Sequence, residues 1–250
     1  MKIILIIPCL LVFSSFAQRQ SAKASLTPMA VVRNFGADYE IKLVNKITVN
    51  TRTNFMVPLK NPVARFKSLN TGIQSGLPGY DWASKAEDIK MTSFGISPQF
   101  RLYLGDEAVA LNGRYITLYS INQFTGFSDF NYMFKDASGN NTVPGTIKVS
   151  NSYIGGGIAY GHQWIFNSGL TVDIIWLGID FGKLGFKMRG ESSGIKAEES
   201  KNAFDAYLEG APDIIKNRLE AEFGSDFVEL KLGLPFATIK ALNFAVGWSF

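Results

Sequence analysis

The chain holds few side chains of the kinds that carry out catalysis. It has one histidine, His162, and one cysteine, Cys9. A nucleophile needs a base within hydrogen-bond reach, and the residues two positions before and after His162 on a strand face are Tyr160 and Trp164. Neither can serve as the nucleophile of a lipid hydrolase. We therefore interpret His162 as a histidine among interfacial aromatics and predict that the protein is not an enzyme.

Metal and phosphate chemistry is no better supported. A zinc site needs several His or Cys ligands, which this sequence does not supply. Glycines 155–157 lie inside a predicted strand and lack the following Lys-Ser/Thr of a phosphate loop. Residues 136–141 offer oxygen ligands without the spacing of a calcium loop. We predict no cofactor and no metal site.

Charged residues that recur on one face of the predicted strands are the remaining candidates. Both signs are present, and small residues lie between them. In a barrel with a polar interior, such residues would close the lumen through internal ion pairs; the alternative is that they are simply solvated. The predicted lumen network consists of Asp38, Glu40, Lys42, Arg52, Arg101, Asp173, Glu229 and Lys231.

Runs of alternating apolar and polar residues position these charges. Successive side chains of a strand point to opposite faces, and membrane-spanning strands need about 9–11 residues. Eight is the smallest common membrane barrel, with an interior just filled by side chains. We predict an all-β fold, an eight-stranded antiparallel transmembrane β-barrel, from the runs at residues 35–43, 47–57, 93–104, 112–124, 147–164, 170–181, 228–236 and 242–250.

The last nine residues alternate most clearly. Leu242, Phe244, Val246, Trp248 and Phe250 share one strand face, and small or polar residues share the other. In an outer-membrane barrel the last strand closes against the first and places an aromatic residue at the membrane interface. We therefore predict that Phe250 is an assembly signal, that the barrel assembly machinery contacts this strand, and that outer-membrane lipid surrounds the barrel.

Three segments interrupt the strands. Residues 58–90 and 125–146 are rich in loop-forming residues and are predicted to be long loops. Residues 196–223 have apolar residues at helical spacing, which predicts a short helical insert of two helices broken near Gly210. By default these helices would pack on the barrel rim.

This strand assignment conflicts with the usual topology of bacterial barrels. With a periplasmic N-terminus and eight strands from residue 35, all three interrupting segments would face the periplasm together with Phe250. Bacterial barrels usually have short periplasmic turns and longer external loops. A further strand at residues 27–33 would reverse the tight links but move the C-terminus outside.

The N-terminus has the pattern of an export signal. A lysine, an apolar run at residues 3–13 and a small-residue exit ending at Ala17 predict a signal peptide over residues 1–17. A leader would follow at residues 18–34, and the barrel domain at 35–250. Removal of the signal peptide would also remove Cys9 and exclude disulfides. The net charge of +4 comes from scattered residues, so we predict no nucleic-acid partner. The predicted location is the cell outer membrane.

Several stretches resemble a family of outer-membrane β-barrel proteins of unknown function found in Bacteroidota. They are the leader ending Phe16-Ala17-Gln18, the hairpin strand 39–43, the strand 97–104, the segment 155–164, the charged helical insert and the C-terminal strand ending at Phe250. The resemblance implies an eight-stranded barrel and offers no established biochemical activity.

The sequence thus favours a non-enzymatic outer-membrane barrel with a filled lumen and a structural or loop-mediated recognition role. Three alternatives remain open. A small pore would need a wider lumen than eight strands usually leave. A lipid-modifying barrel enzyme would need a polar catalytic group. A soluble periplasmic barrel that binds an apolar ligand would carry its apolar face inside.

Overall fold

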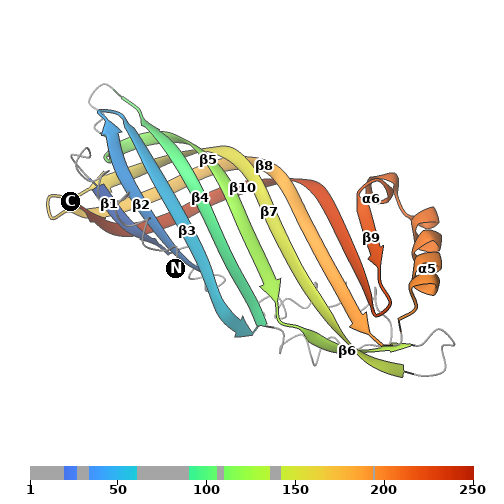
Figure 1. The fold of residues 1–250 in the computed structure, drawn as a ribbon. Helices are drawn as coiled ribbons and strands as arrows, with labels where there is room; N and C mark the ends of the chain where they lie inside the picture. The colour runs from blue at the N-terminus through green and yellow to red at the C-terminus, as the bar shows by residue number, and fades with distance from the viewer. Residues whose placement is uncertain (1–19, 27–33, 61–89, 106–109, 136–141, 194) are drawn as a thin grey trace.

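A closed antiparallel ring of strands forms the body of the protein (Figure 1). The computed structural model describes residues 20–26, 34–60, 90–105, 110–135, 142–193 and 195–250. The ring closes where β1 pairs with β10, with Lys23 opposite Gly247. The predicted eight-stranded antiparallel barrel is confirmed. Its strands are β1 Gln20–Ser25, β2 Asn34–Val44, β3 Ile47–Lys60, β4 Lys90–Tyr103, β5 Gly113–Phe127, β7 Thr142–Ile165, β8 Leu170–Ser192 and β10 Phe227–Ser249.

Two of the eight predicted strands are parts of a single long strand. The runs 228–236 and 242–250 belong to β10, which pairs with β8 from Phe227 to Trp248. Near Leu242, whose φ is 50°, the side chains that face the lumen shift by one residue, from even-numbered to odd-numbered positions. Asn243 lines the lumen on the C-terminal side of this phase change, and Lys240 lines it on the N-terminal side. Such a local irregularity re-aims the side chains of a continuous strand. In the sequence it looks like a turn.

The eighth strand is β1, which lies inside the predicted leader at residues 18–34. Among the described residues the ring therefore begins at Gln20, upstream of the predicted start of the barrel domain at residue 35. All six residues of β1 are small or polar, so no apolar stripe marks this strand in the sequence. Pairing with β2 on one edge and β10 on the other holds the strand in the ring. The predicted signal peptide, Cys9 and residues 61–89 of a predicted loop lie outside the described residues.

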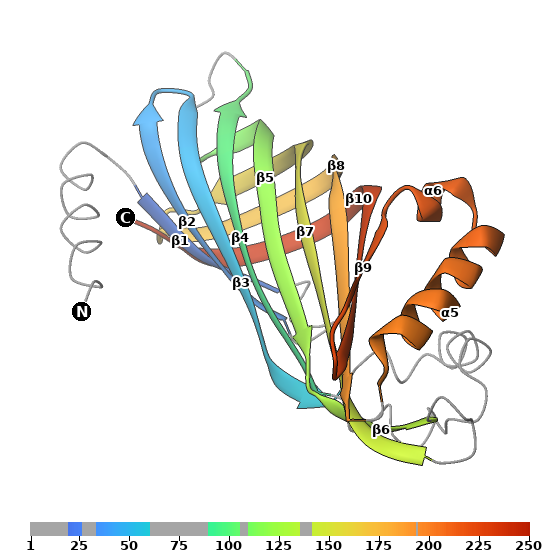
Figure 2. The same ribbon diagram turned by 45° about the vertical axis from the view of Figure 1, so that its right-hand side comes forward.

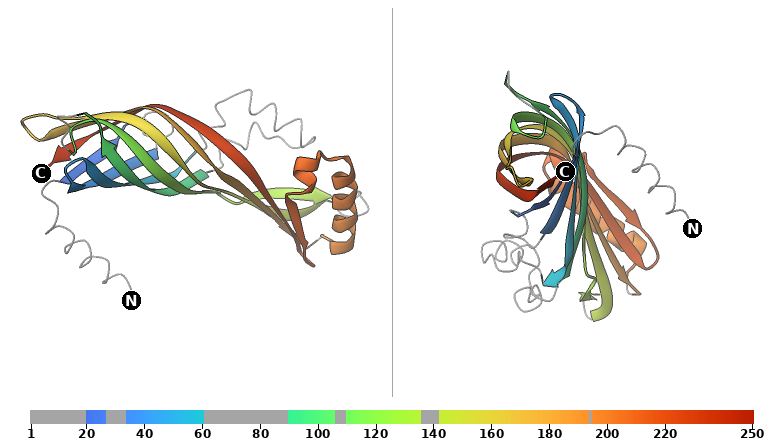
Figure 3. Two further views of the ribbon diagram at one scale, coloured as in Figure 1. Left: turned by 90° about the horizontal axis from the view of Figure 1, so that it is seen from above. Right: turned by 90° about the vertical axis from the view of Figure 1, so that its left-hand side faces the viewer.

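Counting β1 and a single β10 resolves the topological conflict. The tight connections and the C-terminus gather at one end of the barrel, where Tyr103 N donates to Lys46 O at 2.8 Å and Ser249 N donates to Gly169 O at 2.9 Å. We call this the short-turn end. β3, β5 and β8 end at the opposite end of the barrel, which we call the long-segment end (Figure 3). Phe250 and the strand ends that lead into the long segments are therefore at opposite ends of the barrel.

Three strands continue far beyond the ring at the long-segment end. β7, β8 and β10 have 24, 23 and 23 residues, about twice the length that crosses a membrane. With β6 Phe130–Lys135, β9 Leu219–Phe223, α5 Ala197–Gly210 and α6 Asp213–Lys216 they form a projecting unit that we call the extension (Figures 1 and 2). Neither described helix is long and apolar enough to cross a membrane.

The extension confirms the helical insert broken near Gly210 and corrects two details. Residues 219–223 form β9, which pairs with β10, because Leu219 and Phe223 fit a strand face as well as a helical stripe. The predicted loop at 125–146 contains the end of β5, the whole of β6 and the start of β7. Hydrogen bonding between strands stabilises these segments despite their loop-like composition.

Deletion of Phe250 is expected to impair barrel assembly. The Phe250 N–H donates to Gln20 O at 2.9 Å and its carbonyl accepts from Gln20 N at 2.7 Å. The deletion removes both seam hydrogen bonds and the terminal aromatic side chain. The fraction of protein that shifts in mobility on boiling measures assembly, with Phe250→Tyr as the control. Insertion of the truncated chain at the wild-type level would contradict this role.

Candidate functional site

The polar and apolar faces of the barrel are inverted relative to a soluble protein. Glu40 and Arg101 are fully buried, whereas the outward side chains of Phe94, Leu118 and Ile239 are 55%, 58% and 75% exposed. A soluble barrel would bury the apolar face. An exposed apolar wall around a polar interior is the arrangement of a barrel surrounded by lipid.

Four charged side chains meet inside the ring, and we call them the lumen ion cluster: Lys23, Glu40, Arg101 and Asp173. Lys23 Nζ lies 2.6 Å from Glu40 Oε2 and 2.9 Å from Asp173 Oδ2. Arg101 Nη1 lies 3.1 Å and 2.8 Å from the same two oxygens. Two cations therefore share two carboxylates from four different strands, and the cluster is neutral overall.

Neutral side chains satisfy the remaining oxygens of the cluster. Tyr103 donates to Glu40 Oε1 at 2.9 Å, and Tyr115 donates to Asp173 Oδ1 at 2.5 Å. Gln163 Oε1 accepts from both cations, at 2.6 Å and 3.1 Å. Buried charges persist only when such additional hydrogen bonds offset their desolvation. The lumen at this level is filled by fixed, mutually bonded groups.

The inward glycines of β7 make room for this arrangement. A Cβ on Gly161 would lie 2.4 Å from the ring of Tyr115. An inward glycine in a strand usually leaves room for a bulky group that packs close by, and at Gly161 that group is the Tyr115 ring. The Arg101 guanidinium lies over the same ring, 4.4 Å from its centroid.

A second pair extends the network toward the long-segment end. Arg52 Nε donates to Asp38 Oδ1 at 2.7 Å. Asn50 Nδ2 lies 3.2 Å from the same oxygen and 3.1 Å from Gln99 Oε1, and Gln99 accepts from Arg101 Nη2 at 3.2 Å. The pair and the lumen ion cluster therefore form one continuous network.

A small vestibule lies next to this network, on the side of the long-segment end. It has a volume of about 260 Å³ and includes Arg52, Tyr119 and Lys240 in its wall. Beside it, Asp180 accepts from Tyr119 at 3.1 Å and Thr238 at 2.8 Å, and Lys240 Nζ lies 3.5 Å away. The lumen is thus packed toward the short-turn end and hollow toward the long-segment end.

The structure brings together five of the eight predicted lumen residues: Asp38, Glu40, Arg52, Arg101 and Asp173. Lys42 lies on the same face of β2 but is half-buried near the short-turn end, outside the network. The sequence analysis missed Lys23, Gln163, Asp180 and Lys240. Lys23 was hidden in the predicted leader. Lys240 lies beyond the phase change of β10, and Asp180 lies beyond a separate irregularity in the β7–β8 pairing, where Gly161 is opposite Ile175 but Tyr160 is opposite Leu177.

Glu229 and Lys231 were assigned to the lumen wrongly. They lie on the extension, where Glu229 contacts Lys187 at 2.9 Å, Lys231 at 3.0 Å and Arg189 at 3.4 Å. Hydrogen bonds from Lys187 and then Lys231 lower the pKa of Glu229 to about 2. The error arose because the apolar face of the run 228–236 was taken as the outer face, whereas on the extension the outer face is the polar one.

His162 lies on the outer face of the barrel. Its ring stacks on Trp164 with centroids 3.9 Å apart and planes 9° apart. Within the described residues, no group of three or more His, Cys, Asp or Glu side chains could hold a metal ion.

A closed ring with an apolar outer wall and an ion-paired interior defines a transmembrane β-barrel with a largely filled lumen. The chain belongs to the family described as "Protein of unknown function (DUF3575)", which matches residues 3–187. The match ends before α5, β9 and β10. The resemblance to a family of unknown function is thereby confirmed.

One solved structure is similar in outline. It is described as the crystal structure of a major outer membrane protein from Thermus thermophilus, with 12% sequence identity, coverage of 94% of this chain and 99% of that chain, and a TM-score of 0.35. No curated protein matches the sequence.

Proposed function

We propose that this protein is a non-enzymatic, non-conducting outer-membrane barrel that presents its extension for recognition at the cell surface. The observation that carries this proposal is the lumen ion cluster. Lys23, Glu40, Arg101 and Asp173 come from β1, β2, β4 and β8, so their contacts reach across the interior. Eight strands leave an interior that side chains can fill, and here ion pairs fill it.

The orientation follows from the two ends of the barrel. Bacterial outer-membrane barrels have short periplasmic turns and longer external loops. The short-turn end, with Phe250, is then periplasmic, where the barrel assembly machinery would contact β10. The extension lies outside the cell, and outer-membrane lipid covers exposed side chains such as Phe94 and Ile239.

The extension has the construction of a soluble recognition unit. Its outer face carries the ion pairs of Glu229 with Lys187 and Lys231, and α5 packs on β9 through the rings of Phe204 and Phe223, 5.6 Å apart. Charged groups on a β-surface that has left the lipid can remain in water. A recognition role for this unit is supported by its position beyond the lipid-covered wall.

Planar-bilayer recording is expected to show no steady conductance for the wild-type protein. The ion cluster fills the lumen with charges that bind each other, so ions would have to displace them to pass. Protein that shifts in mobility on boiling should be used, because the shift reports a folded barrel. Steady single-channel conductance would overturn the filled lumen. Recovery in the soluble periplasm without a mobility shift would overturn the membrane location.

A further inference from the structure

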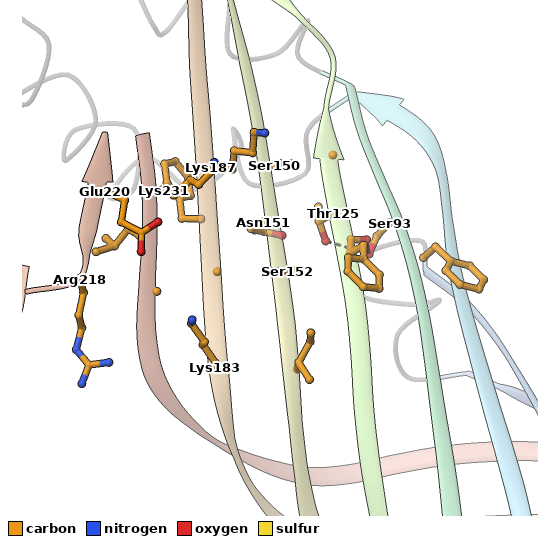
Figure 4. A pocket seen from close by; sticks show the side chains of 18 of the residues that line it. Ser93, Thr125, Ser150, Asn151, Ser152, Lys183, Lys187, Arg218, Glu220 and Lys231 are labelled. Carbon is orange, nitrogen blue, oxygen red and sulfur yellow. Dashed lines mark hydrogen bonds between the residues drawn. The ribbon is translucent and has the colours of Figure 1, made fainter. Parts of the chain in front are cut away.

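A groove lies on the outer face where the barrel meets the extension (Figure 4). Its volume is about 1130 Å³, and Gly126, Ser152, Gly185 and Gly233 are among the residues that line it. These small residues leave the surface hollow. Lys183 lies across Gly233, because a Cβ there would come within 2.5 Å of Lys183 Cε.

The groove is strongly cationic. Lys183, Lys187, Arg218 and Lys231 line it, with Glu220 as the one lining carboxylate among the described residues.

Two of these cations are already engaged, and two are not. Glu229 binds Lys187 and Lys231 at 2.9 Å and 3.0 Å. In the described part of the chain, Lys183 and Arg218 form no ion pair within 4.0 Å. Positive charge therefore remains in the groove after its internal pairs are counted.

An apolar hollow lies on the same outer face, nearer the middle of the barrel. It has a volume of about 420 Å³ and is lined by side chains that include Ile116, Ile158, Leu177 and Ile239. Ile154 lines the cationic groove, and Ile158 lines the hollow. Four residues along β7 correspond to about 13 Å. A cationic site and an apolar hollow thus follow one another down the lipid-facing wall.

We propose that this surface binds one phosphate-bearing lipid of the external leaflet. The headgroup phosphate would contact Lys183 and Arg218, and an acyl chain would lie in the hollow beside Ile158. The proposal rests on the outer-membrane location proposed above, because only a bilayer places a headgroup and its chains at these two depths. The apolar hollow distinguishes a lipid from free phosphate, which has nothing to place there.

Native mass spectrometry in neutral detergent can test this proposal with diphosphorylated lipid A as the probe. The wild-type protein should retain one lipid A molecule in preference to zwitterionic phosphatidylcholine. A basic residue near a membrane surface contributes about 1 kcal/mol to binding an anionic lipid, which corresponds to about fivefold in affinity. The double variant Lys183→Gln/Arg218→Gln should therefore bind lipid A about 25-fold more weakly.

Two further variants sharpen the test. Gly185→Leu fills the groove floor without changing charge and should also reduce lipid A binding. Lys148→Gln is the matched control, because Lys148 is paired with Glu191 at 2.8 Å on the extension and does not line the groove; its binding should equal that of the wild type.

Several outcomes would overturn the lipid site: equal retention of lipid A and phosphatidylcholine, unchanged binding by the double variant, or displacement of lipid A by millimolar inorganic phosphate. The mobility shift on boiling, measured on every variant, reports the barrel separately. Loss of that shift in the wild type would refute the proposed function, whereas a normal shift without selective lipid A binding would refute the lipid site alone.

Discussion

Arg101→Met is expected to lower the free energy of unfolding by about 3–5 kcal/mol, the usual loss when one partner of a buried ion pair is removed. Arg101 is completely buried and contacts Glu40 and Asp173 at 3.1 Å and 2.8 Å. Without it, Lys23 alone would face two carboxylates in the lumen. Urea unfolding of the detergent-folded barrel, followed by the mobility shift, measures the loss.

A double substitution separates charge balance from loss of packing. Arg101→Met/Asp173→Leu leaves Lys23 with Glu40, one cation and one carboxylate at 2.6 Å. This balanced variant should regain much of the lost stability, since replacing a buried pair by apolar groups of similar volume is often neutral or stabilising. Arg189→Met on the extension, where the side chain is 33% exposed, should cost far less. A single Arg101→Met variant as stable as Arg189→Met would show that the cluster does not hold the barrel together.

Gly247→Val is expected to prevent closure of the ring in most molecules. Gly247 faces Lys23 across the seam between β10 and β1. A Cβ at this position would lie 1.9 Å from Ala22 O and 2.5 Å from Lys23 Cα, and both are backbone atoms that no side-chain rotation can move. The short β1 would have to leave the sheet, and Lys23 would leave the lumen ion cluster with it. The heat-modifiable fraction after refolding should fall to a small part of the wild-type value.

Gly210→Ala provides the matched control for this substitution. Gly210 ends α5, and a Cβ there would meet no atom within 4 Å. The control should fold as the wild type does. A normal mobility shift for Gly247→Val would mean that the β1–β10 seam does not close the barrel as described.

The sequence predicted the correct number of strands in the ring, but it missed β1 and divided β10 into two strands. Alternation is readable wherever one strand face meets an apolar environment and the other a polar one, as from Phe94 to Leu102 in β4. It failed for β1, whose place depends on hydrogen bonds to two neighbouring strands rather than on apolar side chains. It failed again at Leu242, where a phase change within one strand resembles a turn.

The candidate site was predicted in part for the same reason. Asp38, Glu40 and Arg52 lie on regular stretches of β2 and β3, so counting by twos from the apolar positions placed them inside. Glu229 lies beyond the phase change of β10 and on the extension, where the polar face is the outer one. No count along a single strand reveals that change of environment.

By itself, the sequence determined the class of fold, the polarity of the barrel wall and most of the charges inside it. These are local properties, because a strand with a period of two shows its faces within a few residues. Only the tertiary structure decided that β1 closes the ring, that Lys23 completes the lumen ion cluster, and that Phe250 lies opposite the extension. Those facts depend on pairing between residues at opposite ends of the chain, such as Lys23 and Gly247. Backbone hydrogen bonds make that pairing, and they leave no pattern in the side chains.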